Sequence, residues 1–212
     1  VAIENIKKKT ENHNIVPVKF QYNKTSLQDM NRQLRIRQRA LPTLKNKESA
    51  LRVEVKKLKH EADEREQLLA SRMAGYHNVL RLWEEFDPSV VQVEQVLLDQ
   101  RKIAGVLIPV LRDVSFRVEP FSLFNKPHWW PDGVATLKEL ARIGIEKQVL
   151  LRAMSLLDRA RKKTTQKVNL YEKVQIPGYE EAVLKIKRFL EDEENLSKSA
   201  QKIVKKRQEA EG

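Results

Sequence analysis

The fold is decided by residues 27–83, which divide into heptads as LQDMNRQ LRIRQRA LPTLKNK ESALRVE VKKLKHE ADEREQL LASRMAG YHNVLRL W. The first heptad position is apolar in eight of nine cases, where a chain that is 41% hydrophobic would give about four. The fourth position is apolar in five of eight cases. An ordinary amphipathic helix would drift by about 20° per heptad from such a period. The pattern therefore predicts one long coiled-coil helix over residues 24–86.

Pro42 interrupts this predicted helix. A proline removes one backbone donor, and its ring clashes with the preceding turn. We expect either a kink near residues 38–41 or a separate short helix before the proline.

A weaker version of the same period returns near the C-terminus. Seven-residue steps from Ile143 and from Leu140 give seams that are apolar but interrupted. The sequence Ile176-Pro177-Gly178 should break or bend the helix, after which an apolar stripe resumes. This predicts a second long helix over residues 134–207, bent near residue 177.

Each predicted helix has only one apolar seam, so each must bury that seam against the other. Because the two helices are similar in length, we expect a long antiparallel coiled-coil hairpin in an all-α dominated, single elongated domain (1–212) with an N-terminal extension at residues 1–23. The predicted seam residues are Leu27, Leu34, Leu44, Leu51, Val55, Leu58, Leu69, Leu150, Met154, Leu157 and Val168.

The connection at residues 87–133 differs from both helices and holds five of the eight prolines. Asp87-Pro88 is typical of a helix N-terminus and predicts a short helix to about Leu98. Lys102–Val110 and Asp113–Phe121 are rich in Val, Ile and Phe, and they predict a short β-hairpin.

A two-stranded hairpin is only marginally stable alone. We expect it to pack on the helices or on a partner through Val106, Ile108 and Phe116. The turn-rich segment 126–133 contains Trp129 and Trp130. Its two interpretations are a loop that packs one tryptophan against the strands and a loop that contacts a partner.

The composition excludes most catalytic chemistry. The chain has no cysteine, and its six glycines are at least 11 residues apart, so it contains neither thiolate sites nor a phosphate-binding glycine loop. Its four histidines lack the spacing of a zinc-binding helix. No apolar run approaches the length of about 18 residues that a membrane span needs, and Val1–Val18 does not resemble a signal peptide. We predict no catalytic residue, no cofactor and no metal site.

The net charge of +12 is unevenly distributed. Residues 1–60 sum to +10, residues 61–136 to −4 and residues 137–212 to +6. Such a basic chain could be a nucleic-acid-binding protein or a basic coiled-coil adaptor. However, its Lys and Arg residues are interspersed with Glu, and no basic-aromatic platform is evident, so a solvated helical surface is the simpler interpretation.

The order of several short motifs resembles a known family. These motifs are Leu27-x6-Leu34, Leu44-Lys45-x-Lys47-x3-Leu51, Val106-Leu107-Ile108-Pro109, Val168-Asn169 and Ile176-Pro177. From about Phe20 to Arg188 the chain resembles the D subunit, the central stalk, of V/A-type rotary ATPases and V-type ATP synthases. It departs from the family at Pro42, at Trp129-Trp130 and in the extension before Val18.

The resemblance implies a non-catalytic rotor axle with no cofactor. Its expected partners are the A and B subunits of the catalytic hexamer, the small F subunit, and a funnel-shaped adaptor that links the stalk to the membrane ring. It implies neither direct nucleotide binding nor nucleic-acid binding. It also implies a cytoplasmic location, peripheral to the membrane within a membrane-bound complex.

Overall fold

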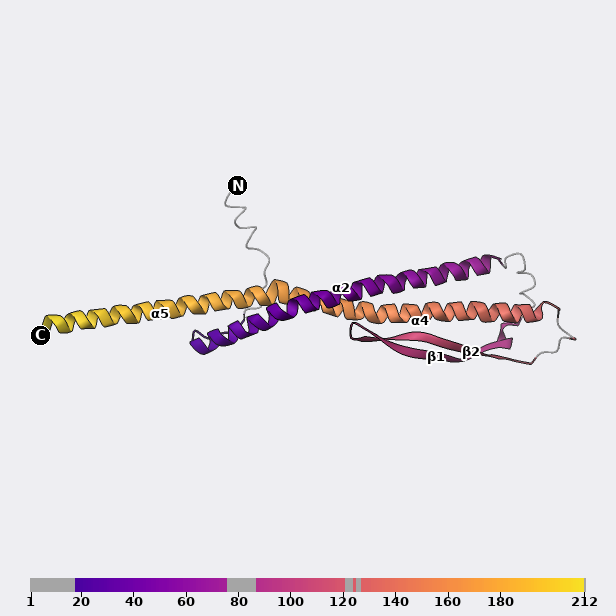
Figure 1. Ribbon diagram of the computed structural model, residues 1–212, viewed down its shortest axis with the longest axis horizontal. Coiled ribbons are helices and arrows are strands. Elements are labelled where there is room, and N and C mark those ends of the chain that lie inside the picture. The colour runs from indigo at the N-terminus through magenta and orange to yellow at the C-terminus, as the bar shows by residue number, and fades with distance from the viewer. Residues whose placement is uncertain (1–17, 76–86, 121–123, 125–126, 212) are drawn as a thin grey trace, which may run out of the picture. The chain divides into compact units, whose positions relative to one another are not determined.

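The computed structural model describes residues 18–75, 87–120, 124 and 127–211 (Figure 1). Its elements are the helix α2 (Lys24–Gly75), the 3₁₀ turn η2 (Pro88–Val90), the strands β1 (Val91–Ile103) and β2 (Val106–Val118), the helix α4 (Trp130–Asn169), the π-helical segment η4 (Leu170–Gln175) and the helix α5 (Ile176–Glu211). The predicted fold class, mostly helical with a central antiparallel hairpin, is confirmed. Residues 76–86 of the predicted first helix and residues 1–17 of the extension lie outside the described residues.

The chain divides into two compact units, which we describe separately. The hairpin unit comprises residues 47–163, and the two-helix unit comprises residues 1–46 and 164–212.

The helix α2 begins at a side-chain cap. The Ser26 backbone N–H donates to Asn23 Oδ1 over 2.7 Å, and the Leu27 N–H donates to the Asn23 carbonyl over 3.1 Å. An asparagine cap of this kind satisfies donors that the first helical turn leaves free. Pro42 lies inside an unbroken helix, so the alternative of a separate short helix before it is wrong. The predicted kink stays a prediction.

In the hairpin unit, α2 and α4 pair antiparallel. Ion pairs join Arg65 to Glu146 over 3.0 Å, Lys147 to Glu66 over 2.9 Å and Arg72 to Glu139 over 3.2 Å, so rising numbers on α2 meet falling numbers on α4. The strands β1 and β2 lie alongside α4 (Figure 1). Ile108 of β2 shares a buried cluster with Leu51, Leu58, Ala153 and Leu157. The core of this unit therefore lies among two helices and a β-hairpin.

The β-hairpin is longer than predicted and begins earlier. Val91 pairs with Val118 and Ile103 with Val106, and the connecting Ala104 and Gly105 have φ of 47° and 81°. Two consecutive positive φ values are those of a type I′ turn, whose twist suits antiparallel strands. The predicted strand at Lys102–Val110 is wrong because this turn falls inside it, and the second predicted strand starts seven residues too late.

The predicted helix to Leu98 is also wrong. The Ser89 N–H donates to Asp87 Oδ1 over 2.9 Å, as expected of a cap, but the turn ends at Val90. The β-branched residues Val91 and Val93 follow at once and favour a strand. Their pairing with Val118 and Phe116 supplies the backbone hydrogen bonds that a helix would otherwise have made.

In the two-helix unit, α2 pairs with η4 and α5, again antiparallel. Met30 is buried with Val183 and Ile186. Further along α2, Arg37 Nε donates to Gln175 Oε1 over 2.7 Å, and Lys45 pairs with Glu172 over 2.7 Å. Among the described residues of this unit no strand packs on the core, which the helix pair forms with Val18 and Phe20 beside it.

The predicted break at residues 176–178 is replaced by the π-helical segment η4. The Ile176 N–H donates to the Tyr171 carbonyl, five residues back. Seven-residue steps from Ile143 reach Tyr171, but the next seam residue, Tyr179, is eight residues on, and Ile186 follows after seven. Because a π turn holds one extra residue, it keeps both parts of the seam on one line. The predicted bend near residue 177 stays a prediction.

Candidate functional site: an interaction groove

The predicted seam residues fall into three groups. Leu51, Leu58, Leu157 and Val168 are buried. Val55, Leu150 and Met154 pack against the hairpin-unit core, whereas Leu27 packs against Met30 in the other unit. Leu34, Leu44 and Leu69 are half-buried and lie outside both clusters. The predicted seam residues thus contribute to two separate hydrophobic cores, one in each unit.

Sequence reasoning missed two small buried residues, Ala153 and Ala182. They are 1% and 2% exposed, whereas the equally buried Ala62 already stood at a first heptad position. Ala153 lies one residue before the predicted seam residue Met154, and its cluster also contains Ile108 of the hairpin. The sequence feature that could have pointed to Ala153 is a small residue next to the seam. Its short side chain lets the β-hairpin pack on α4 as a third layer of the core.

The residues predicted as partner contacts are buried or half-buried. Ile108 is 3% exposed and Trp130 is 1% exposed, so both hold the hairpin on the helices. Val106 packs against the same core as Ile108, and Phe116 is half-buried.

Trp130 opens α4 and forms a second cluster with Val134, packed against Val91 and Val118 of the strands. One tryptophan packs against the strands, as the first interpretation of this segment expected, but the predicted loop is wrong from Trp130 on because α4 begins there. Trp129 lies beside this cluster, with its ring centroid 5.8 Å from that of Trp130.

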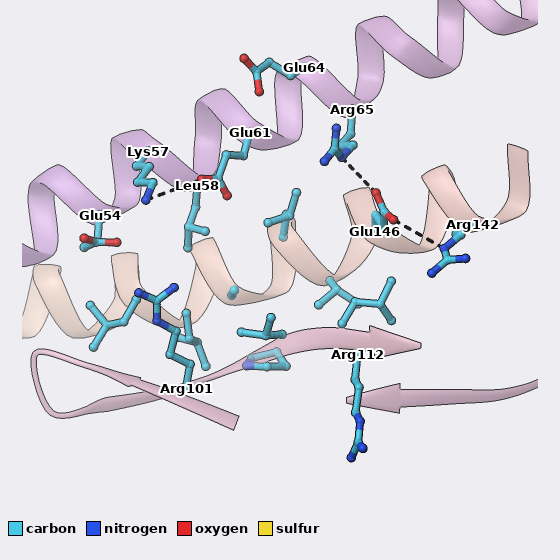
Figure 2. A pocket seen from close by; sticks show the side chains of 18 residues that line it. Glu54, Lys57, Leu58, Glu61, Glu64, Arg65, Arg101, Arg112, Arg142 and Glu146 are labelled. Carbon is cyan, nitrogen blue, oxygen red and sulfur yellow. Dashed lines mark ion pairs between the residues drawn. The ribbon is translucent and has the colours of Figure 1, made fainter. Parts of the chain in front are cut away.

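A groove of about 330 Å³ lies between α2, α4 and the hairpin (Figure 2). Its floor is apolar and includes Leu58, Ile108, Leu150 and Ala153. Its rim is charged and includes Glu54, Lys57, Glu61, Glu64, Arg65, Arg101, Arg112, Arg142 and Glu146. The groove thus has the apolar centre and polar rim of a protein-binding surface.

The rim is mixed in charge on α2 and basic on the strands. Glu54, Glu61 and Glu64 of α2 alternate with Lys57 and Arg65, whereas Arg101 and Arg112 come from the strands (Figure 2). At one end, Glu146 holds Arg65 at 3.0 Å and Arg142 at 3.9 Å, which closes the groove between the helices. A protein segment with an apolar stripe and with acidic side chains toward the strands would fit this arrangement.

The hairpin also carries an exposed apolar surface. Its members are Val93, Val96, Leu97 and Leu98 of β1 with Leu107 and Val110 of β2. Exposed apolar residues gathered on one element mark an interaction site more often than single ones do. In the sequence, three consecutive apolar residues, Val96-Leu97-Leu98, break the alternation of apolar and polar residues that a half-buried strand shows. This run is the sequence feature from which the exposed surface could have been predicted.

The π-helical segment is held by a clamp around Arg37. The guanidinium carbon of Arg37 lies 4.5 Å from the Tyr179 ring centroid and 5.9 Å from that of Tyr171. Its Nε donates to Gln175 Oε1. The clamp joins α2 to both ends of the segment in which the helix takes up its extra residue.

Comparison with known proteins gives a consistent result. The family model that describes the D subunit of ATP synthase matches residues 26–206. The D subunit of the V-type ATP synthase of Borreliella burgdorferi is 30% identical over 189 residues, which cover 88% of this chain and 94% of that protein. Those of Chlamydia caviae and Chlamydia trachomatis serovar L2 are 27% and 28% identical over 79% of this chain, and the matches cover 83% and 85% of their own lengths. The chain belongs to the family of D subunits of V-type ATP synthases.

Proposed function

We propose that this chain is the central stalk of a V-type ATPase or ATP synthase. It transmits torque between a catalytic hexamer of A and B subunits and the ion-translocating ring in the membrane. The observation that carries the proposal is the family match over residues 26–206, which includes both helix pairs and the hairpin. Catalysis belongs to the hexamer, and this chain is non-catalytic.

The helix pairing suits an axle. In each unit two antiparallel helices share a buried seam, and ion pairs such as Arg65–Glu146 and Lys45–Glu172 cross between them. Two helices locked together resist torsion better than one, because twisting either must break contacts with the other. A shaft with different faces would present a different surface to each nucleotide site and would shift the conformational populations of these sites as it turns.

The hairpin unit supplies surfaces for the remaining partners. The groove with its charged rim and the exposed apolar residues of β1 and β2 are the places where an F subunit and the funnel-shaped adaptor would dock. No helix in the described part of the chain combines the length and the hydropathy that crossing a bilayer requires. Attachment to the membrane would therefore come through the complex, to which this chain is peripheral.

Co-expression with the A, B and F subunits, followed by native mass spectrometry, tests the proposal. We expect one copy of this chain for each A and B hexamer, because an axle occupies a single central position. A chain that carries nucleic acid and no A, B or F subunit would overturn the assignment in favour of a basic nucleic-acid-binding coiled coil.

A matched pair of variants tests the docking surface in the same experiment. Leu107→Asp places a charge at a hairpin residue that is 58% exposed, and Val53→Asp does so at an apolar residue of α2 in the same unit that is 64% exposed. We expect only Leu107→Asp to lower the occupancy of the F subunit. Equal occupancy with both variants would contradict a docking role for the hairpin.

A further inference from the structure

The strand β1 is the outer strand of the hairpin. Each of its residues from Gln92 to Lys102 is exposed, whereas β2 has Ile108 and Val114 buried. Among the residues that the structure describes, β2 is the one strand that pairs with β1. The second edge of β1 therefore presents a row of backbone N–H and C=O groups that no strand of this chain satisfies.

This edge has few of the features that protect an exposed strand from further pairing. Protected edge strands are short, contain proline or are bent by bulges. The strand β1 has 13 residues and no proline, and Glu94 is its one bulged residue, so the stretch after it runs without interruption. At its centre, Val96-Leu97-Leu98 are all exposed. A long, regular edge with an apolar centre is a template on which another strand can add.

The charges of β1 favour a second β1 as that strand, in the antiparallel direction. Glu94 lies in the first half of the strand, whereas Arg101 and Lys102 lie near its end. The other acidic residue, Asp99, already lies 4.0 Å from Arg112 of β2. In an antiparallel pair, the first half of one strand lies opposite the second half of the other, so Glu94 of each copy meets the basic end of its partner. A parallel pair would place like charges opposite one another.

We propose that β1 of the unassembled chain pairs antiparallel with β1 of a second copy and joins the two hairpins into one continuous sheet. A two-fold axis near Leu98 makes the contact isologous and brings the apolar centres of both strands together. Isolated two-stranded hairpins are marginally stable, and additional strands stabilise them. The pairing covers an apolar surface that the free chain would otherwise expose to water.

This pairing would also affect assembly. The hairpin surface proposed for partner docking includes Leu97 and Leu98, so self-pairing and docking exclude each other. The pair must therefore open before the chain enters a complex. This consequence rests on the proposed function, whereas the pairing itself does not.

Exchange of charges in the full-length chain tests the proposal. Sedimentation velocity should show the wild type in a monomer–dimer equilibrium with a dissociation constant on the order of 10 μM, as expected of a small interface. Glu94→Lys and the double variant R101E/K102E each place like charges opposite one another and should weaken the dimer at least about 10-fold. The combined variant E94K/R101E/K102E exchanges the two signs and should restore the dissociation constant to within about threefold of the wild type.

Two controls separate this contact from general charge effects. The variant K56E/K59E makes the same change in net charge at exposed residues of α2 in the same unit, and it should change the dissociation constant less than about twofold. Because the chain has no cysteine, mild oxidation of Leu98→Cys should give a disulfide-linked dimer, whereas Leu107→Cys on β2 should stay monomeric. Circular dichroism checks that every variant stays helical.

Each outcome decides the proposal. Weakening by both reversals, rescue by the combined variant and a Leu98→Cys dimer would support it. A wild type that stays monomeric up to about 1 mM would overturn it, and so would a dimer that neither reversal weakens. If the wild type alone is monomeric and R101E/K102E loses the F subunit from the co-expressed complex, the strand binds a partner and the inference is wrong. Assembly with the A and B hexamer, which native mass spectrometry decides, is a separate result.

Discussion

The two units bury the apolar seams of their paired helices in different ways. In the hairpin unit, α4 keeps the seven-residue step through Leu150 and Leu157, and the strands add Ile108 to the helix seam. In the two-helix unit no strand contributes to the core, which contains fewer buried residues. There the seam shifts by one residue at η4, and the Arg37 clamp joins the helices.

The difference shows what the β-hairpin contributes as a third layer on a helix pair. In the hairpin unit, Ile108 of the strands adds apolar burial to a helix pair that ion pairs such as Arg65–Glu146 also join. In the two-helix unit, the contacts of Arg37 with Gln175 and Tyr179 add to a smaller apolar seam, and more helix surface remains for partners. Four experiments with variants of this chain would break or sharpen this comparison.

Insertion of one alanine after Gln175 should have the largest effect. The π-helical segment η4 already takes up one extra residue, and a second one would turn α5 by about 100° relative to α2, because each α-helical residue turns by that angle. Val183 and Ile186 would then leave Met30, and we expect a loss of roughly 3–5 kcal/mol, comparable to removing a large core side chain. Urea unfolding followed by circular dichroism measures the loss. Deleting Lys173 in the insertion variant should restore stability, and an insertion variant as stable as the wild type would contradict the register argument.

Ile108→Ala tests the third layer. Ile108 is 3% exposed in the hairpin-unit core, so we expect a loss of about 2–4 kcal/mol. Its neighbour Leu107 is 58% exposed, and Leu107→Ala should cost less than about 0.5 kcal/mol. Hydrogen exchange should show faster opening of α2 around Leu51 and Leu58 only in the Ile108 variant. Unchanged exchange there would mean that the hairpin does not support the helices.

The same substitution at two glycines should act with opposite signs. Gly105 has φ of 81°, so Gly105→Ala should cost about 1 kcal/mol by straining the turn. Gly144 lies within α4, where an added Cβ meets no atom within 4 Å, and Gly144→Ala should stabilise by about 0.5–1 kcal/mol. Thermal unfolding of both variants measures the difference. Equal shifts of the melting temperature would rule out the I′ turn as the element that sets the hairpin register.

Asp158→Asn should have the smallest effect, and the effect should depend on pH. Hydrogen bonds from Lys162 and from Arg161 lower the pKa of the Asp158 carboxyl below its ordinary value of 3.8. A lowered pKa stabilises the fold above the unfolded-state value, and this contribution is lost as the pH falls through the folded-state pKa. Because these are pairs within one helix, we expect roughly 0.5 kcal/mol at neutral pH. Wild type and variant should converge at pH 2, and a difference that persisted there would contradict this origin.

The heptads of residues 27–83 predicted the long paired helices well, because a strict seven-residue period leaves few alternatives. The π-helical segment was also predictable: extending the steps past Tyr171 shows that Tyr179 and Ile186 are one residue late. The strand β1 was less accessible, since Asp87-Pro88 favours a helix start and only pairing with β2 makes a strand of Val91–Ile103.

The interaction surfaces could be identified only from the structure. The turn at Ala104–Gly105 lacks the usual Asn-Gly signal, so the hairpin register could not be derived from the sequence. The burial of Ile108 and Trp130 depends on contacts with residues distant in the sequence.

The most direct test of the account is whether this chain rotates within the hexamer. Because the chain has no cysteine, Arg117→Cys at an exposed strand position gives a single attachment point for a bead on an otherwise unlabelled chain. With the A and B hexamer fixed to a surface, ATP should drive the bead in one direction, in steps of a third of a turn. ATP hydrolysis at full rate with a stationary bead would contradict the proposed role as a rotating axle.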